Sequence, residues 1–347
     1  MRPIPLRVKL FVRSAAAISL WLFSCIVPPP SLAASKVVGK FGHTAASPSV
    51  IGETAAEFAK RVNGRASGLE IQVFPDSQLG GTQTLVESVM IGNVHLSPAG
   101  YGVLGAFVPE LGALELPFIF GDKLDIERIL KVMSSDLFEE WQKILATQKG
   151  IRVVAPAWYY GHRDLLVKKP AVRPEDLKGQ KIRVVPAPLY VEIMKALGAV
   201  PTPVDWPETY NALRQGVIDG VDAPTEFFLY TKLYEGAKNY LRTHHITGLN
   251  AMITNAKWYS DLAPADRKVL DEELVWFQTR MAEKLTAAEP GVIKDLAANG
   301  VTISQIDLAA FRQAVERARV AEKVAEAQKW RPETLPRFQK IVKDAGF

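Results

Sequence analysis

The order of predicted strands and helices constrains the fold most, because the same alternation occurs twice along the chain. In the first run, apolar stretches predict strands over residues 36–41 and 69–74, and an apolar face at helical spacing predicts a helix over 54–62 between them. A helix over 85–90 and a strand over 94–97 continue the series. Strands that alternate with helices are typical of a parallel sheet flanked by helices, so this segment predicts an α/β unit.

The alternation starts again at residue 151. A helix is predicted over 189–197, and strands are predicted over 151–155, 164–167, 181–185 and 201–204. The 347 residues, 48% of them hydrophobic, exceed what one hydrophobic core usually holds. The predicted fold class is therefore α/β, with two lobes of similar construction.

Helices dominate the remainder of the chain. Apolar residues near helical spacing predict a helix from Pro264 to about residue 288, which Pro290 is expected to interrupt or kink. Residues 308–329 have a strongly charged helical pattern with a narrow apolar stripe.

The first 34 residues have the pattern of an export signal. Basic residues precede an apolar run over 15–27, and prolines and small residues follow it. About a dozen apolar residues fall short of the ~20 that a membrane-spanning helix needs, which argues against an uncleaved anchor. We predict a signal peptide over 1–34 and a periplasmic location. Residues 22–25 loosely resemble a lipoprotein cleavage site, so lipidation at Cys25 is an alternative.

Charge and cysteine content exclude several functions. Residues 1–34 contain four of the 42 basic residues and none of the 37 acidic ones, so the rest of the chain has a net charge of +1. A near-neutral chain without a Lys/Arg cluster gives no support for nucleic-acid binding. Cys25 is the only cysteine, which leaves the mature chain without a disulfide or a thiol nucleophile.

Sequence patterns for catalysis are weak. The five histidines lack the spacing of a helical zinc motif, and neither a phosphate-binding glycine loop nor a nucleophile-elbow serine motif occurs. We therefore predict a binding protein without a cofactor, and not an enzyme.

Arg183 is the residue whose context points to a ligand. It lies in the predicted strand 181–185, and Pro186 after that strand ends the ladder and suggests a strand leading into a cleft. The planar guanidinium group matches a carboxylate through two parallel hydrogen bonds. From the residues alone, a structural salt bridge at Arg183 remains the alternative.

Three segments in this region resemble a known family. They are residues 175–184 (EDLKGQKIRV), 197–203 (LGAVPTP) and 210–220 (YNALRQGVIDG), with 74–80 (FPDSQLG) and 116–118 (LPF) upstream. Their order and spacing resemble the DctP-type extracytoplasmic receptors of TRAP transporters. The resemblance covers essentially the whole mature chain.

The resemblance implies a periplasmic-binding-protein-like clamp of two α/β lobes, with hinge strands and a long lobe-spanning helix. Lobe I is expected over 35–160, with a return at about 250–288, and lobe II over 161–249. A C-terminal helical region over 289–347 is expected to pack across the lobes.

The same resemblance implies roles for individual residues. Arg183 stands where the family binds the ligand carboxylate, Arg163 where a second arginine assists, and Trp206 where an aromatic ring packs on the ligand. Ala223 replaces an asparagine that is frequent in sialic-acid receptors, which disfavours a sialic-acid-like, hydroxyl-rich ligand. Some members hold a metal beside a Glu-Trp pair, but this chain has Asp222 and Ala223 there, so no metal is expected.

Further ligand contacts are expected from both lobes. Lobe I should contribute Thr44 and Tyr101, and aromatic surface should come from Trp158 and Phe227. A cleft rich in rings favours a carboxylate with an aromatic or branched apolar body. A 2-oxo or 2-hydroxy acid fits comparably, since its vicinal oxygen could use Arg163 or Thr44.

The function expected is that of a monomeric receptor that delivers a small organic acid to the integral membrane subunits of a TRAP transporter. One alternative is an exported enzyme that binds its substrate through Arg183 and uses His162 or His43 as acid or base. Another is a receptor that reports to a sensor kinase.

Overall fold

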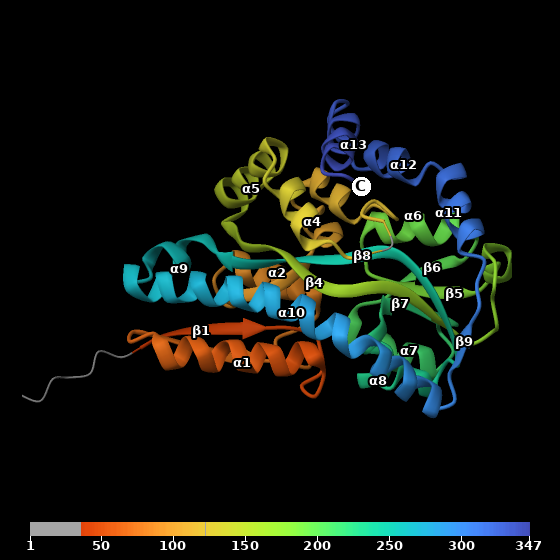
Figure 1. Cartoon of the computed structure of the whole chain (residues 1–347), viewed down its shortest axis with the longest axis horizontal. Helices are drawn as coiled ribbons and strands as arrows, with labels where there is room; N and C mark the ends of the chain where they lie inside the picture. Colours follow the sequence, from red (N-terminus) through yellow and green to blue (C-terminus); the bar gives the residue numbers. More distant parts are fainter. Residues whose placement is uncertain (1–35, 122) are drawn as a thin grey trace, which may run out of the picture. The chain divides into compact units, whose positions relative to one another are not determined.

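The computed structural model describes residues 36–121 and 123–347, and its described strands form one mixed β-sheet (Figure 1). The predicted signal peptide, Cys25 included, lies outside the described residues. The strand order is β2-β1-β3-β8-β4-β7-β5-β6, with β9 beside β8. The strands are β1 (Val37–Gly42), β2 (Leu69–Phe74), β3 (Leu96–Gly100), β4 (Ile151–Val167), β5 (Lys181–Val184), β6 (Val200–Pro203), β7 (Gly220–Pro224), β8 (Asn239–Asn255) and β9 (Thr302–Ser304).

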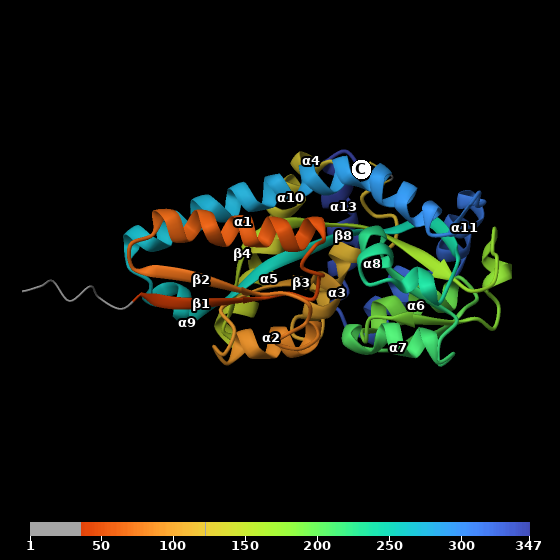
Figure 2. The ribbon, with the colours of Figure 1, turned by 90° about the horizontal axis from the view of Figure 1, so that it is seen from below.

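Helices lie on both sides of this sheet (Figure 2). The α-helices are α1 (Val50–Arg65), α2 (Thr82–Met90), α3 (Tyr101–Leu104), α4 (Ile126–Met133), α5 (Asp136–Lys149), α6 (Pro188–Ala196), α7 (Thr209–Arg214), α8 (Thr225–Tyr230), α9 (Ala256–Asp261), α10 (Pro264–Ala298), α11 (Leu308–Arg317), α12 (Val320–Ala327) and α13 (Thr334–Asp344). Short 3-10 helices are η1 (Pro109–Glu115), η2 (Pro174–Leu177), η3 (Trp206–Glu208) and η4 (Leu233–Glu235). Within the described ranges, no helix combines enough length with enough apolar character to span a bilayer.

Two groups of parallel strands stand at the two ends of the sheet. The first group is β2-β1-β3 and the second is β7-β5-β6, and in each group the neighbouring strands pair in parallel. Helices connect successive strands in both groups, because their apolar faces can be buried only against the sheet. The prediction of two α/β units is confirmed.

The long strands β4 and β8 join the two groups. The C-terminal end of β8 pairs antiparallel with β3, while the C-terminal end of β4 pairs antiparallel with β7. The predicted lobe boundaries at 160/161 and 249/250 therefore fall inside these two strands. Register shifts interrupt the β4–β8 ladder at four places, and bulges of this kind bend a strand and increase its twist.

Glycine is required at one pair of residues between the long strands β4 and β8. Gly161 is paired with Gly248, and a Cβ at position 248 would lie 2.1 Å from the carbonyl oxygen of Gly161. Gly161 also has a positive φ of 97°, which side-chain-bearing residues rarely adopt. The close approach of the two strands at this point thus depends on two residues that have no side chain.

Helix α10 runs alongside both strand groups. It packs on α1 beside the first group, on β4, and on α8 beside the second group. We expected the helix to reach about residue 288 and Pro290 to interrupt or kink it; Pro290 does not interrupt the helix, because α10 continues to Ala298. A proline inside a helix costs about 3 kcal/mol. Val292 and Leu296 are buried beyond it, so packing offsets that cost.

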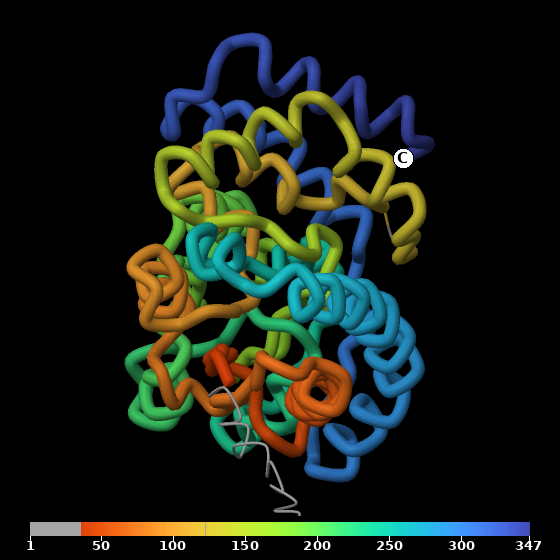
Figure 3. Tube along the Cα trace, turned by 90° about the vertical axis from the view of Figure 1, so that its left-hand side faces the viewer, coloured from red at the N-terminus to blue at the C-terminus, as the bar shows by residue number. Residues whose placement is uncertain are grey.

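The C-terminal helices form a layer of their own, drawn in blue at the top of Figure 3. The single helical pattern predicted over 308–329 is divided into α11 and α12, because Arg319 adopts the left-handed conformation between them. Helices α11 and α12 pack on α6, and α13 packs on η1.

Glu226 is a buried carboxylate between the two ends of the sheet. It belongs to α8 and is 5% exposed. Its two oxygens have no hydrogen bond of regular geometry with a described residue, but they face the N–H groups of Ile51 and Val50 and the Ser49 hydroxyl at the start of α1. Burial raises the pKa of Glu226 to about 7, although these donors act in the opposite direction.

This raised pKa predicts a pH dependence of stability. In the unfolded chain Glu226 loses its proton near pH 4.5, whereas the folded protein holds that proton up to about pH 7. The free energy of unfolding should therefore fall as the pH rises between these values, by about 3 kcal/mol from this residue. Glu226→Gln should lack this component. Urea unfolding of the wild type and of Glu226→Gln at pH 5, 6, 7 and 8 measures this difference. If the free energy of unfolding changes with pH in the same way in both proteins, the raised pKa of Glu226 is refuted.

Candidate functional site

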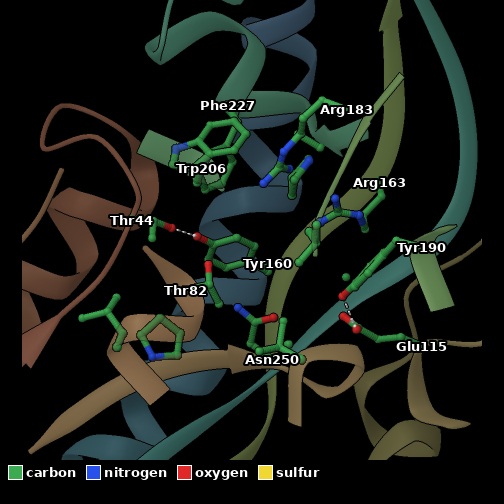
Figure 4. A pocket seen from close by; sticks show the side chains of 18 residues that line it. Thr44, Thr82, Glu115, Tyr160, Arg163, Arg183, Tyr190, Trp206, Phe227 and Asn250 are labelled. Atoms are coloured by element: carbon green, nitrogen blue, oxygen red, sulfur yellow. Dashed lines mark hydrogen bonds between the residues drawn. The ribbon is translucent and has the colours of Figure 1, made fainter. Parts of the chain in front are cut away.

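A cavity lies between the two strand groups (Figure 4). It has a volume of about 650 Å³, with open solvent at its mouth included. The residues that line it are Thr44, Thr82, Leu85, Pro98, Gly100, Val103, Glu115, Tyr160, Arg163, Arg183, Val185, Tyr190, Trp206, Ala223, Pro224, Phe227, Gly248 and Asn250.

Arg183 enters the cavity from β5 as a buried cation without a counter-ion. Its Nε donates to the carbonyl oxygen of Val204 at 2.9 Å, and its Nη1 donates to that of Asp222 at 3.3 Å. Arg183 is 3% exposed. Within the described ranges, no carboxylate lies within salt-bridge distance of its guanidinium group. Burial, followed by repulsion from Arg163, lowers the pKa of Arg183 to about 10. An anion placed beside it would offset both unfavourable effects.

Arg163 on β4, in contrast, is paired with a carboxylate. Its Nε and Nη2 donate to the two carboxylate oxygens of Asp222 on β7, both at 2.9 Å. His245 of β8 places its Nε2 3.3 Å from the same carboxylate. Burial opposes ionisation of Asp222, but Arg163 and His245 outweigh it and hold the pKa of Asp222 well below its usual range.

The charges of Arg163, Asp222 and Arg183 together leave this end of the cavity with an excess of one positive charge. Arg163 and Asp222 offset each other, and Arg183 remains. An uncompensated buried charge is unfavourable in the empty protein. The arrangement is therefore suited to the capture of one negative charge.

Aromatic rings form the wall next to Arg183. The Arg183 guanidinium carbon lies 5.1 Å from the ring centre of Trp206, and Phe227 meets Trp206 edge to face at 4.8 Å. Tyr160 packs against Phe227 and shares a 3.2 Å hydrogen bond with the Thr44 hydroxyl. The cation is thus held against apolar surface that can also contact a ligand body.

Polar groups occupy the opposite end of the cavity. Glu115 accepts hydrogen bonds from Tyr190 Oη and from the backbone N–H of Gly102, both at 2.6 Å and both through Oε2. Burial raises the pKa of Glu115 and so favours its neutral form. Asn250 lies nearby on β8, and Figure 4 shows it at the end remote from Arg183.

Most of the predicted ligand-binding residues are brought together here. Six line the cavity, namely Arg183, Arg163, Trp206, Thr44, Ala223 and Phe227. Two predicted residues do not line it. Tyr101 is the first residue of α3 and donates its hydroxyl to the carbonyl of Pro156, and Trp158 packs against Phe277 of α10 and the ring of Tyr160. Both are fully buried in the core.

The cavity residues that were not predicted include Tyr160, Tyr190, Glu115 and Asn250. Glu115 and Asn250 each interrupt an apolar run, GALELPFIF and GLNAMIT, and a lone polar residue in such a run is a usable signal of a buried polar site. Tyr160 was passed over in favour of its neighbours on the same strand. Nothing in the sequence distinguished Tyr190 from a core residue of α6.

No histidine is among the residues that line this cavity. Neither His162 nor His43, the acid and base candidates of the enzyme alternative, is among its lining residues. Across the described part of the chain, no group of three or more His, Cys, Asp or Glu side chains could hold a metal ion.

Comparison with known proteins gives one consistent family. Residues 41–326 match the family model DctP, bacterial extracellular solute-binding protein, family 7. The chain is 26% identical to the sialic acid-binding periplasmic protein SiaP of Vibrio cholerae over 278 residues, which cover 80% of this chain and 85% of that protein.

Solved structures agree in fold. A TRAP periplasmic solute binding protein from Ochrobacterium anthropi with bound L-fuconate superimposes with a TM-score of 0.82 and is 28% identical in sequence. The match covers 89% of this chain and 100% of that protein's chain. One from Actinobacillus succinogenes with bound L-galactonate has a TM-score of 0.81, 28% identity and the same coverage. The chain belongs to the DctP family of bacterial extracellular solute-binding proteins, which are periplasmic receptors of TRAP transporters and not enzymes.

Proposed function

We propose that this receptor captures a small organic monocarboxylate, with Arg183 as the residue that binds the carboxylate. The observation that carries the proposal is the buried guanidinium of Arg183, which faces the cavity without a counter-ion among the described residues. Two carbonyl oxygens fix its orientation, so a carboxylate would meet a preorganised partner.

Arg163 is proposed to assist in a different way from Arg183. Asp222 accepts hydrogen bonds from Nε and Nη2 of the Arg163 guanidinium group, and Nη1 has no hydrogen bond with a described residue. Arg163 can therefore offer one further donor to the ligand, while the pair with Asp222 keeps the total charge of the site at one positive unit.

The ligands of related structures support this charge. L-Fuconate and L-galactonate, bound in two relatives of 28% identity, each carry one carboxylate. A ligand with one negative charge matches the excess charge of Arg183, whereas a second carboxylate would meet Glu115 at the other end of the cavity.

Receptors of TRAP transporters work with integral membrane subunits, and we propose that this chain delivers its acid to such subunits as a monomer. Export through a signal peptide over 1–34 is part of the proposal, and a lipid on Cys25 is its less favoured variant. A receptor of a sensor kinase would differ in gene neighbourhood, where the two membrane subunits would be missing.

Substitution of Arg183 tests the anchor. Arg183→Lys keeps the charge but loses the two-pronged geometry, so affinity for L-fuconate or L-galactonate should fall clearly. Arg183→Ala should lower it further, by ~2 to 5 kcal/mol or about 30-fold to several thousand-fold. Calorimetric titration measures the loss, circular dichroism checks the fold, and Arg317→Lys on the exposed face of α11 is the control. Tight binding by folded Arg183→Ala would refute the anchor.

Binding should also close the two halves on each other. The cavity is lined from both strand groups, and a ligand gains contacts with both only when they approach. The radius of gyration from small-angle X-ray scattering should therefore decrease on addition of a saturating acid. Superimposable curves with and without it would speak against closure.

The mature N-terminus is predicted near Ser35. The basic start, the short apolar run and the small residues before it are the signals that a signal peptidase uses. The intact mass of the exported protein reports the cleavage site. A mass that includes a diacylglyceryl group on Cys25 would establish the lipoprotein instead.

A further inference from the structure

One side chain reaches from the second strand group to the first at the edge of the cavity. Asp205 precedes η3 in the second group, and Gly81 precedes α2 in the first. A Cβ at residue 81 would lie 1.9 Å from Oδ2, 2.4 Å from Cγ and 2.5 Å from Oδ1 of Asp205, so the carboxylate occupies the place of a side chain there. Thr82 and Trp206, the next residues along the chain, both line the cavity (Figure 4), so the contact lies at its edge.

The backbone itself does not require glycine at position 81. Its φ of −75° and ψ of −178° are extended angles that any residue adopts. The preceding Gly80 differs, because its φ of 110° is one that side-chain-bearing residues rarely adopt. Gly81 is buried, and the three atoms nearest to a Cβ there all belong to Asp205. The space that Gly81 leaves is therefore used by the opposite half of the receptor.

Helix α2 has no side-chain cap from its own segment. Ser49, Asp125 and Ser135 each accept a backbone N–H at the start of α1, α4 and α5, respectively. Gly81 has no side chain for this purpose. The first N–H groups of a helix have no acceptor within the helix, and a negative charge near them is stabilising. The Asp205 carboxylate brings such a charge to the start of α2 from the other strand group.

Asp205 is also held on its own side of the cavity. Its Oδ1 accepts a hydrogen bond from the backbone N–H of Trp206 at 2.8 Å, and its carbonyl oxygen accepts one from the Thr209 hydroxyl at 3.0 Å. The Trp206 ring in turn packs on Arg183 and on Phe227. A displacement of the Asp205 carboxylate would therefore disturb a ring that forms part of the cavity wall.

We infer that Asp205 is a positioning residue of the closed receptor, which caps α2 in the space that Gly81 leaves and so holds Trp206 in the cavity wall. The inference rests on the proposed closure of the two halves, because the contact joins one half to the other. Glu226 of the second half faces the start of α1 in a comparable way. Opening would leave the start of α2 without the carboxylate, so the contact favours the closed state.

Cysteine pairing tests the contact directly, because residues 35–347 contain no cysteine. A Cβ at residue 81 lies 2.4 Å from Asp205 Cγ, so the two Cβ atoms are at most about 4 Å apart, which a disulfide spans. Mild oxidation of folded Gly81→Cys/Asp205→Cys should therefore consume both thiols within one molecule. Gly64→Cys/Asp205→Cys is the matched control and should keep its thiols, since nothing lies within 4 Å of a Cβ at Gly64 in α1. A pair at 81 and 205 that stays reduced, with and without L-fuconate or L-galactonate, would overturn the contact.

Affinity then tests the role of the contact in closure. Calorimetric titration would use whichever of L-fuconate and L-galactonate binds the wild type more tightly. Gly81→Ala adds one methyl group where the halves meet and changes no charge, so it should lower the affinity at least about 10-fold. Asp205→Ala removes all three atoms that this methyl group would meet. In the Asp205→Ala background, Gly81→Ala should therefore change the affinity less than about twofold. Gly64→Ala is the control and should bind as the wild type does.

The outcomes separate this inference from the proposed function. An equal loss of affinity from Gly81→Ala with and without Asp205 would mean that the methyl group acts within its own half, and it would overturn the inference. Unchanged affinity of Gly81→Ala in the otherwise wild-type protein would overturn it too. In both cases loss of binding in Arg183→Ala leaves the carboxylate anchor standing. Full binding by folded Arg183→Ala refutes the proposed function itself, whatever the disulfide shows.

Discussion

The antiparallel pairing of β4 with β8 is the interaction on which the other parts of this structure depend. The ladder runs from the pair Ile151 and Asn255 to the pair Val167 and Asn239, and each end of it carries one group of parallel strands. Its register shifts twist the two groups relative to a regular sheet. The same two strands supply Tyr160, Arg163, Gly248 and Asn250 to the cavity, so the element that joins the halves also forms the floor between them.

Charge pairing explains why two neighbouring arginines differ. The pair between Arg163 and Asp222 satisfies a buried cation and a buried anion together, with His245 beside them. Arg183 has carbonyl oxygens and the face of Trp206 as partners, which hold it in place without neutralising it. A receptor gains affinity from such a site because its ligand removes an unfavourable charge that already exists in the empty cavity.

Local patterns predicted the regular elements well and the irregular ones poorly. The prediction of a strand over 69–74 agrees with β2 residue for residue, because strict alternation has one simple solution on a half-buried strand. Strand β8 was not predicted, since histidine, threonine, glycine and asparagine interrupt its apolar positions. The helix through Pro290 was judged too short, because burial of Val292 and Leu296 beyond the proline is a tertiary effect.

The sequence by itself determined the α/β class and the family and singled out Arg183 as a candidate, because these follow from periodicity and from short motifs whose residues are neighbours along the chain. Only the tertiary structure decided which arginine is neutralised, since Asp222 lies 59 residues from Arg163 and the two meet only through the register of β4 and β7. It also decided that Glu115, Tyr190 and Asn250 share a cavity while Tyr101 and Trp158 do not. Which side chains meet in one cavity depends on packing between segments that are distant in the sequence, and no local pattern contains that information.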